Sequence, residues 1–140
     1  MLSLSPNLRQ TLLEEFRYVA NEMRKTEDPA RKLYFFSATY GSVNRIFNIE
    51  FDPELVFAHL VLNNAHQTID TRISSISQRR EGAIGIPDGL LEKLTQAVEE
   101  LTDNWEKGKP IDGTLRNIAL LTYATTGNGY YLYLKGQLSI

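Results

Sequence analysis

Three dipeptides, each a capping residue followed by proline, divide the first half of the chain at similar intervals: Ser5-Pro6, Asp28-Pro29 and Asp52-Pro53. The polar side chain of each pair can accept a hydrogen bond from an unpaired amide of a first helical turn. Proline suits the next position because its missing N–H has no partner there. Apolar residues at helical spacing follow each pair. The sequence therefore predicts three long helices, over residues 6–25, 29–48 and 53–77.

The second half predicts two more helices, which Asp88 and Asp112 would open. The first of these, ending near Lys107, has the cleanest amphipathic pattern of the chain. For the tyrosine-rich stretch 130–134 we favour a further helical turn or two over a strand, because no strong strand precedes it. Short connections make sequential helices antiparallel. The predicted fold class is all-α, an up-and-down antiparallel helical bundle of four to five helices, in one domain over residues 1–140.

The third predicted helix is apolar nearly all round in its first half, over residues 55–62. Such a pattern is typical of a buried helix, so we expect it to be the central element of the bundle. Gly41, inside the second helix, would cost about 1 kcal/mol relative to alanine, and we expect it to mark a close helix crossing.

Composition narrows the function classes. A chain of 140 residues with 42% hydrophobic residues can bury a core without disulfides or a structural metal. The net charge of −2 offers no general attraction for phosphate backbones or anionic lipid, which disfavours nucleic acid. Cysteine is absent, and no run of 18 apolar residues occurs. We therefore expect a cytoplasmic protein that does not enter a membrane.

The two histidines of the chain share one face of the third predicted helix with a carboxylate. His59, His66 and Asp70 are seven and four residues apart, and Asn63 lies between the histidines. These side chains can bind a divalent metal or transfer a proton. No Glu-x-x-His or His-Glu-x-x-His pair accompanies them. A polar seam that sets helix register is the favoured interpretation, and a metal-dependent or acid–base enzyme is the alternative.

Tyrosines are concentrated near the C-terminus, at Tyr123, Tyr130, Tyr131 and Tyr133. Tyrosine joins a large apolar area to a polar tip, which suits an interface or the end of a core. We favour an interface and the end of the core equally, and we favour a small-molecule pocket less than either.

Arginines form one concentrated basic stretch at Arg72, Arg79 and Arg80, and a second lies at the turn formed by residues 24–25 and 31–32. Two basic turns can contact phosphates. Cationic side chains also gather at helix ends because they complement the helix dipole, and this explanation is favoured. An accessory nucleic-acid-binding subunit is a weaker alternative.

No glycine-rich phosphate loop and no Gly-x-Ser-x-Gly elbow occurs, and no cofactor is predicted. The predicted helices also present more apolar surface than one central seam needs. The leading hypothesis is therefore a non-catalytic interaction or assembly protein of unknown pathway. It would self-associate as a homo-oligomer, with a homodimer as the expected form, or bind a protein partner. The contacts would come from part of the third helix and from the tyrosine-rich C-terminal segment.

Overall fold

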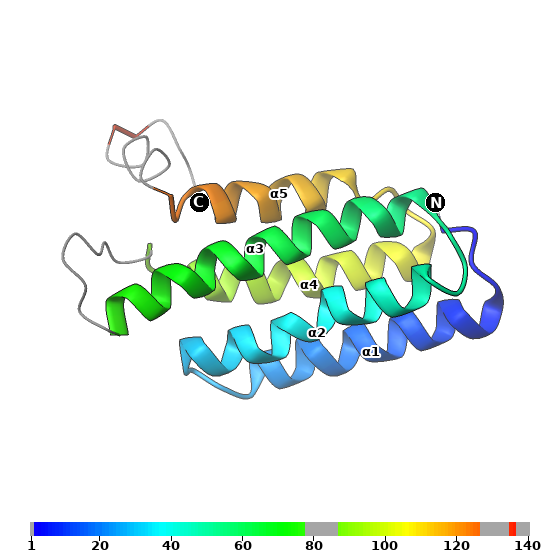
Figure 1. Ribbon diagram of the computed structural model, residues 1–140, viewed down its shortest axis with the longest axis horizontal. Helices are drawn as coiled ribbons and strands as arrows, with labels where there is room; N and C mark the ends of the chain where they lie inside the picture. The colour runs from blue at the N-terminus through cyan, green and yellow to red at the C-terminus, as the bar shows by residue number, and fades with distance from the viewer. Residues whose placement is uncertain (1, 78–86, 127–134, 137–140) are drawn as a thin grey trace.

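The computed structural model describes residues 2–77, 87–126 and 135–136, and within these ranges every regular element is a helix (Figure 1). The predicted all-α class is confirmed, and the helix ends agree with the predicted ends to within two residues. None of the described helices is long and apolar enough to cross a membrane. The elements are α1 (Pro6–Arg24), α2 (Pro29–Phe47), α3 (Pro53–Ser77), α4 (Leu90–Lys107) and α5 (Asp112–Tyr123).

Successive helices run in alternate directions, which confirms the up-and-down bundle (Figure 1). Helix α1 packs on α2 and α4, α3 packs on α2 and α5, and α4 packs on α5, so the five helices close into a ring. Helices α3 and α5 consequently lie side by side and run in the same direction, although α4 separates them in the sequence (Figure 1). Their N-terminal halves therefore meet at one end of the bundle.

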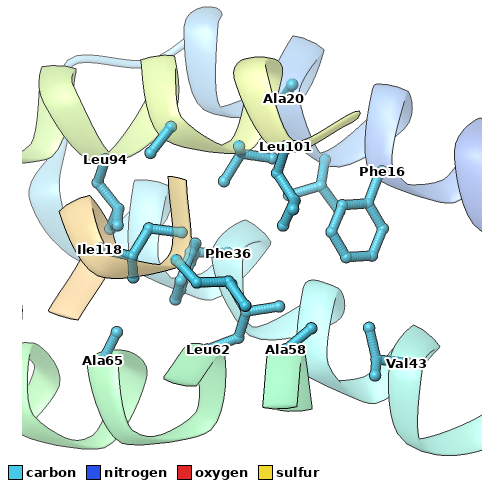
Figure 2. Packing of buried hydrophobic residues seen from close by; sticks show 14 of the residues in the cluster. Phe16, Ala20, Phe36, Val43, Ala58, Leu62, Ala65, Leu94, Leu101 and Ile118 are labelled. Atoms are coloured by element: carbon cyan, nitrogen blue, oxygen red, sulfur yellow. The ribbon is translucent and has the colours of Figure 1, made fainter. Parts of the chain in front are cut away.

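The interior is one contiguous apolar cluster with side chains from all five helices. Figure 2 shows Phe16, Phe36, Leu62, Leu101 and Ile118 directed into this shared space. Dense packing of such side chains provides most of the stability that helix propensity alone cannot supply. Five buried threonines donate to carbonyls three or four residues earlier in the chain, which satisfies their hydroxyls.

The helix starts follow the predicted capping chemistry only in part. Asp28 accepts a hydrogen bond from the amide of Arg31, and Asp52 accepts one from the amide of Glu54. Ser5 occupies the cap of α1, but its side chain makes no capping hydrogen bond.

The predicted helix start at Asp88 is wrong by two residues, whereas the predicted start at Asp112 is confirmed. Gly89 precedes α4 in place of Asp88, at a φ of 77° that glycine adopts without strain. Asp112 is the first residue of α5 and follows the cap residue Ile111, so its carboxylate instead lies in a first turn, where the helix dipole favours it.

Two expectations about the helix interiors are also wrong. Helix α3 is not buried all round, because it lies between only two well-packed neighbours and its outward face carries the exposed Phe57 and Leu60. Gly41 is exposed, and a Cβ added there would meet no atom within 4 Å, so this glycine marks no close crossing inside the chain.

Candidate interaction surface

Large apolar side chains are exposed at the N-terminal end of α3. Phe51, just before the helix, is 72% exposed, while Phe57 and Leu60 on α3 are 66% and 59% exposed. One turn of helix separates Phe57 from Leu60, so both lie on the same outward face. The buried stripe of α3, which includes Leu55 and Leu62, points to the opposite side. Helix α3 therefore has two apolar faces, and the core covers only one of them.

An open groove of about 730 Å³ borders this outward face, between the N-terminal halves of α3 and α5. Phe57 and Val61 line it from α3, Leu115 and Ala119 line it from α5, and Ile111 lines it from just before α5. We call this feature the α3/α5 groove. It exists because the two helices run in parallel from the same end of the bundle (Figure 1). Its lining is mostly apolar, as in sites that bind an apolar partner group.

Charged side chains border the α3/α5 groove at the starts of both helices. Glu54 belongs to α3, whereas Asp112 and Arg116 belong to α5. The guanidinium of Arg116 lies 3.5 Å from the Asp112 carboxylate, one helical turn away. The rim therefore carries two carboxylates, and its one arginine lies beside one of them.

Sequence reasoning did not single out Phe51, Phe57 or Leu60 as site residues. The signal was present, because residues 55–62 carry more apolar side chains than one buried face can hold. The pattern could not tell which of these side chains face outward, since that depends on which helices flank α3 in the ring.

The predicted tyrosine interface lies largely outside the described residues. This holds for Tyr130, Tyr131 and Tyr133, together with the predicted helical turn at residues 130–134. Tyr123 is half-buried in the last turn of α5. Its backbone carbonyl accepts hydrogen bonds from the amide and the hydroxyl of Thr126, which end the helix. The role of these tyrosines as an interface stays a prediction.

The histidines of α3 pack against aromatic residues of α2. His59 contacts the rings of Tyr40 and Phe47, with centroid distances of 6.2 and 6.1 Å. His66 lies 5.5 Å from the Tyr40 ring, and its Nδ1 is 3.4 Å from the Tyr40 hydroxyl. Asp70 is exposed one turn further on. In the described ranges no three or more acidic or histidine side chains are grouped to hold a metal ion.

The basic residues of the first turn make contacts within the bundle. Lys32 is buried and donates to the carbonyl of Met23 at 2.6 Å, at the end of α1. Arg24 donates two hydrogen bonds to Glu99, at 2.5 and 3.2 Å, and also bonds Glu92. The hydrogen bond from Arg24 lowers the pKa of the Glu92 carboxyl. These cations join α1 to its neighbours, in line with the structural explanation of the basic turn.

Arg72, the first residue of the other basic stretch, donates to the carbonyl of Thr125 at 3.2 Å. This bond joins the C-terminal part of α3 to the residues that follow α5. Arg79 and Arg80 lie outside the described residues, so a nucleic-acid contact at this stretch stays a prediction.

No protein-family model matches the sequence, no curated protein matches it, and no solved structure matches its fold. The function is therefore inferred from the exposed apolar residues of α3 and from the α3/α5 groove.

Proposed function

We propose that this protein is a non-catalytic interaction and assembly protein that self-associates through α3. The observation that carries the proposal is the exposure of Phe57, which lines the α3/α5 groove, together with that of Leu60 on the same outward face of α3. Burying a phenylalanine or leucine side chain is worth about 1.5–3 kcal/mol relative to leaving it in water. Adjacent exposed apolar residues next to an apolar groove are typical of a surface that another protein covers.

A second copy of the chain is the partner to which we commit. The net charge of −2 is small, so two copies approach without strong general repulsion. The α3/α5 groove has charged residues at its rim and apolar residues at its centre, which is the usual anatomy of a protein interface.

The tyrosine-rich C-terminal segment belongs to the same proposal as a second contributor. Its support is the interface preference of tyrosine, and its test is Tyr131→Asp, which we expect to weaken the oligomer without unfolding the monomer. We also propose the cytoplasm as the compartment, on the ground that the chain has no cysteine and needs no oxidising environment.

The experiment is sedimentation velocity of the wild type and Phe57→Asp at the same concentration. A carboxylate at position 57 would be desolvated on association, so we expect the variant to sediment as a monomer of 15.9 kDa while the wild type sediments faster. Leu120→Asp is the matched control, because Leu120 is an exposed apolar residue of α5 that does not line the groove. A folded Phe57→Asp with unchanged sedimentation would overturn the proposal.

A further inference from the structure

A second exposed aromatic surface lies on α1 and α2. The ring of Tyr18 is 6.4 Å from that of Phe35, and the ring of Tyr34 is 5.3 Å from that of Phe35; both pairs are nearly edge-to-face. The guanidinium of Arg31 lies over Phe35, 5.9 Å from its centroid. We call these four residues the aromatic patch. Edge-to-face rings and a cation over a ring hold one another in place before any partner arrives.

The side chains of the aromatic patch are exposed, whereas the α3/α5 groove is concave. Tyr34 is 71% exposed and Tyr18 is 57% exposed. Phe36, the third aromatic of the run that starts at Tyr34, is fully buried, and Phe35 is half-buried against the core. Tyrosine and arginine are the residues most enriched at the energetic centres of protein interfaces, where they fill pockets on the partner. The exposure and composition of the patch therefore suit insertion of a tyrosine into an apolar groove.

The two surfaces belong to different parts of the ring. The patch lies on α1 and α2, and the groove lies between α3 and α5, with the α2–α3 contact separating them. In Figure 1 α1 and α5 form the two outer edges of the bundle. One molecule cannot bring its own patch into its own groove, so contact between the two surfaces needs two molecules.

The charges of the two surfaces are complementary. The patch carries the cationic Arg31, and the groove rim carries Glu54 and Asp112, with Arg116 beside Asp112. A tyrosine of the patch in the groove would bring the Arg31 guanidinium near a rim that holds more carboxylate than guanidinium. Opposite charges at a rim speed association and fix its orientation.

We propose that the aromatic patch of one copy occupies the α3/α5 groove of the next copy, so that the protein assembles head to tail. This inference rests on the proposed self-association, and it assigns the patch and the groove as the two surfaces that contact each other. Because the surfaces are unlike, an open assembly still offers one free patch at one end and one free groove at the other. The assembly therefore grows with concentration, or closes into a ring of more than two copies, and does not stop at a two-fold dimer.

The test combines two variants that each damage one surface. Tyr34→Asp disrupts the patch and keeps the groove, whereas Phe57→Asp disrupts the groove and keeps the patch. We expect each variant alone to be a monomer of 15.9 kDa by light scattering. An equimolar mixture should form a mixed dimer of twice that mass and nothing larger, because the intact patch of one variant fills the intact groove of the other.

Leu120→Asp, at an exposed apolar position outside both surfaces, should assemble as the wild type does. Thermal melts of all three variants establish that they are folded. A mixture that stays monomeric overturns the head-to-tail pairing. If Tyr34→Asp keeps the wild-type mass while Phe57→Asp is monomeric, self-association stands and only the head-to-tail mode is wrong. A wild type that is itself a monomer contradicts both proposals.

Discussion

Asp52 and Ser3 are joined by two hydrogen bonds across 49 residues of sequence. One carboxylate oxygen of Asp52 accepts the backbone amide and the hydroxyl of Ser3, each at 2.8 Å, while the other accepts the Glu54 amide at the start of α3, also at 2.8 Å. Ser5 makes a similar bond, from its amide to Glu50. The N-terminal segment is thus held against the α2–α3 turn, at the end of the bundle where the α3/α5 groove begins.

Asp52→Ala should lower the free energy of unfolding by about 2–3 kcal/mol, because it removes a helix cap and leaves the Ser3 amide without its buried acceptor. Asp28→Ala is the matched control. Asp28 caps α2 through a single bond to Arg31 in an exposed position, so we expect a loss of about 1 kcal/mol or less. Urea unfolding of both variants measures the difference, and equal losses would contradict the role of the Ser3 contacts.

The stability that Asp52 contributes should depend on pH. Burial alone would raise the pKa of this carboxyl, but the hydrogen bonds from Ser3 and Glu54 outweigh burial and lower the pKa. A lowered pKa in the folded state means that the contribution is complete above the ordinary aspartate pKa of about 3.9 and is lost as the pH falls below it. The stability gap between the wild type and Asp52→Ala should therefore be constant from about pH 7 to pH 5 and shrink below about pH 4. If this stability difference widens on acidification, the pKa of Asp52 is raised in the folded state and not lowered.

Phe36 and Phe57 provide a matched test of which aromatic residues belong to the core. Phe36 is fully buried and Phe57 faces outward. Phe36→Ala should lower the free energy of unfolding by about 3–5 kcal/mol. Phe57→Ala should change it by no more than about 0.5 kcal/mol at a protein concentration where the wild type is monomeric. Denaturant unfolding of both variants measures these changes. A large loss of unfolding free energy for Phe57→Ala would mean that this residue stabilises the monomer.

Addition of Zn²⁺, Mn²⁺ or Fe²⁺ should leave the melting temperature unchanged, because His59 and His66 pack against Tyr40 and Phe47 of α2. A metal that bound only the folded state would raise the melting temperature in proportion to the logarithm of its concentration. His66→Ala is the control. A metal-dependent rise in the wild type that is lost in this variant would favour the alternative of a metal-dependent enzyme.

Much of the fold was predictable because its signals are local. Proline and aspartate at the starts of α2 and α3 determine the helix starts through contacts within a single turn. The wrong prediction at Asp88 has a local cause as well. Gly89 adopts a positive φ directly after it, and its carbonyl accepts the amide of Lys93, so the helix begins two residues later than the aspartate indicated.

The candidate surface was less predictable because it depends on contacts between distant segments. The pattern of residues 55–62 predicted a buried helix, and only the position of α3 in the ring shows that Phe57 and Leu60 face outward. The α3/α5 groove likewise requires two helices that α4 separates in the sequence. The same applies to Lys32, whose contact with Met23 turns an apparent phosphate-binding residue into a helix-end contact.

The absolute molar mass of the wild type, measured by light scattering over a concentration series, tests the central claim of self-association most directly. We predict a mass above the 15.9 kDa of one chain that rises with concentration, since copies associate through the outward face of α3. A constant mass of 15.9 kDa up to about 100 µM, a range that detects even weak association, would contradict self-association through this face.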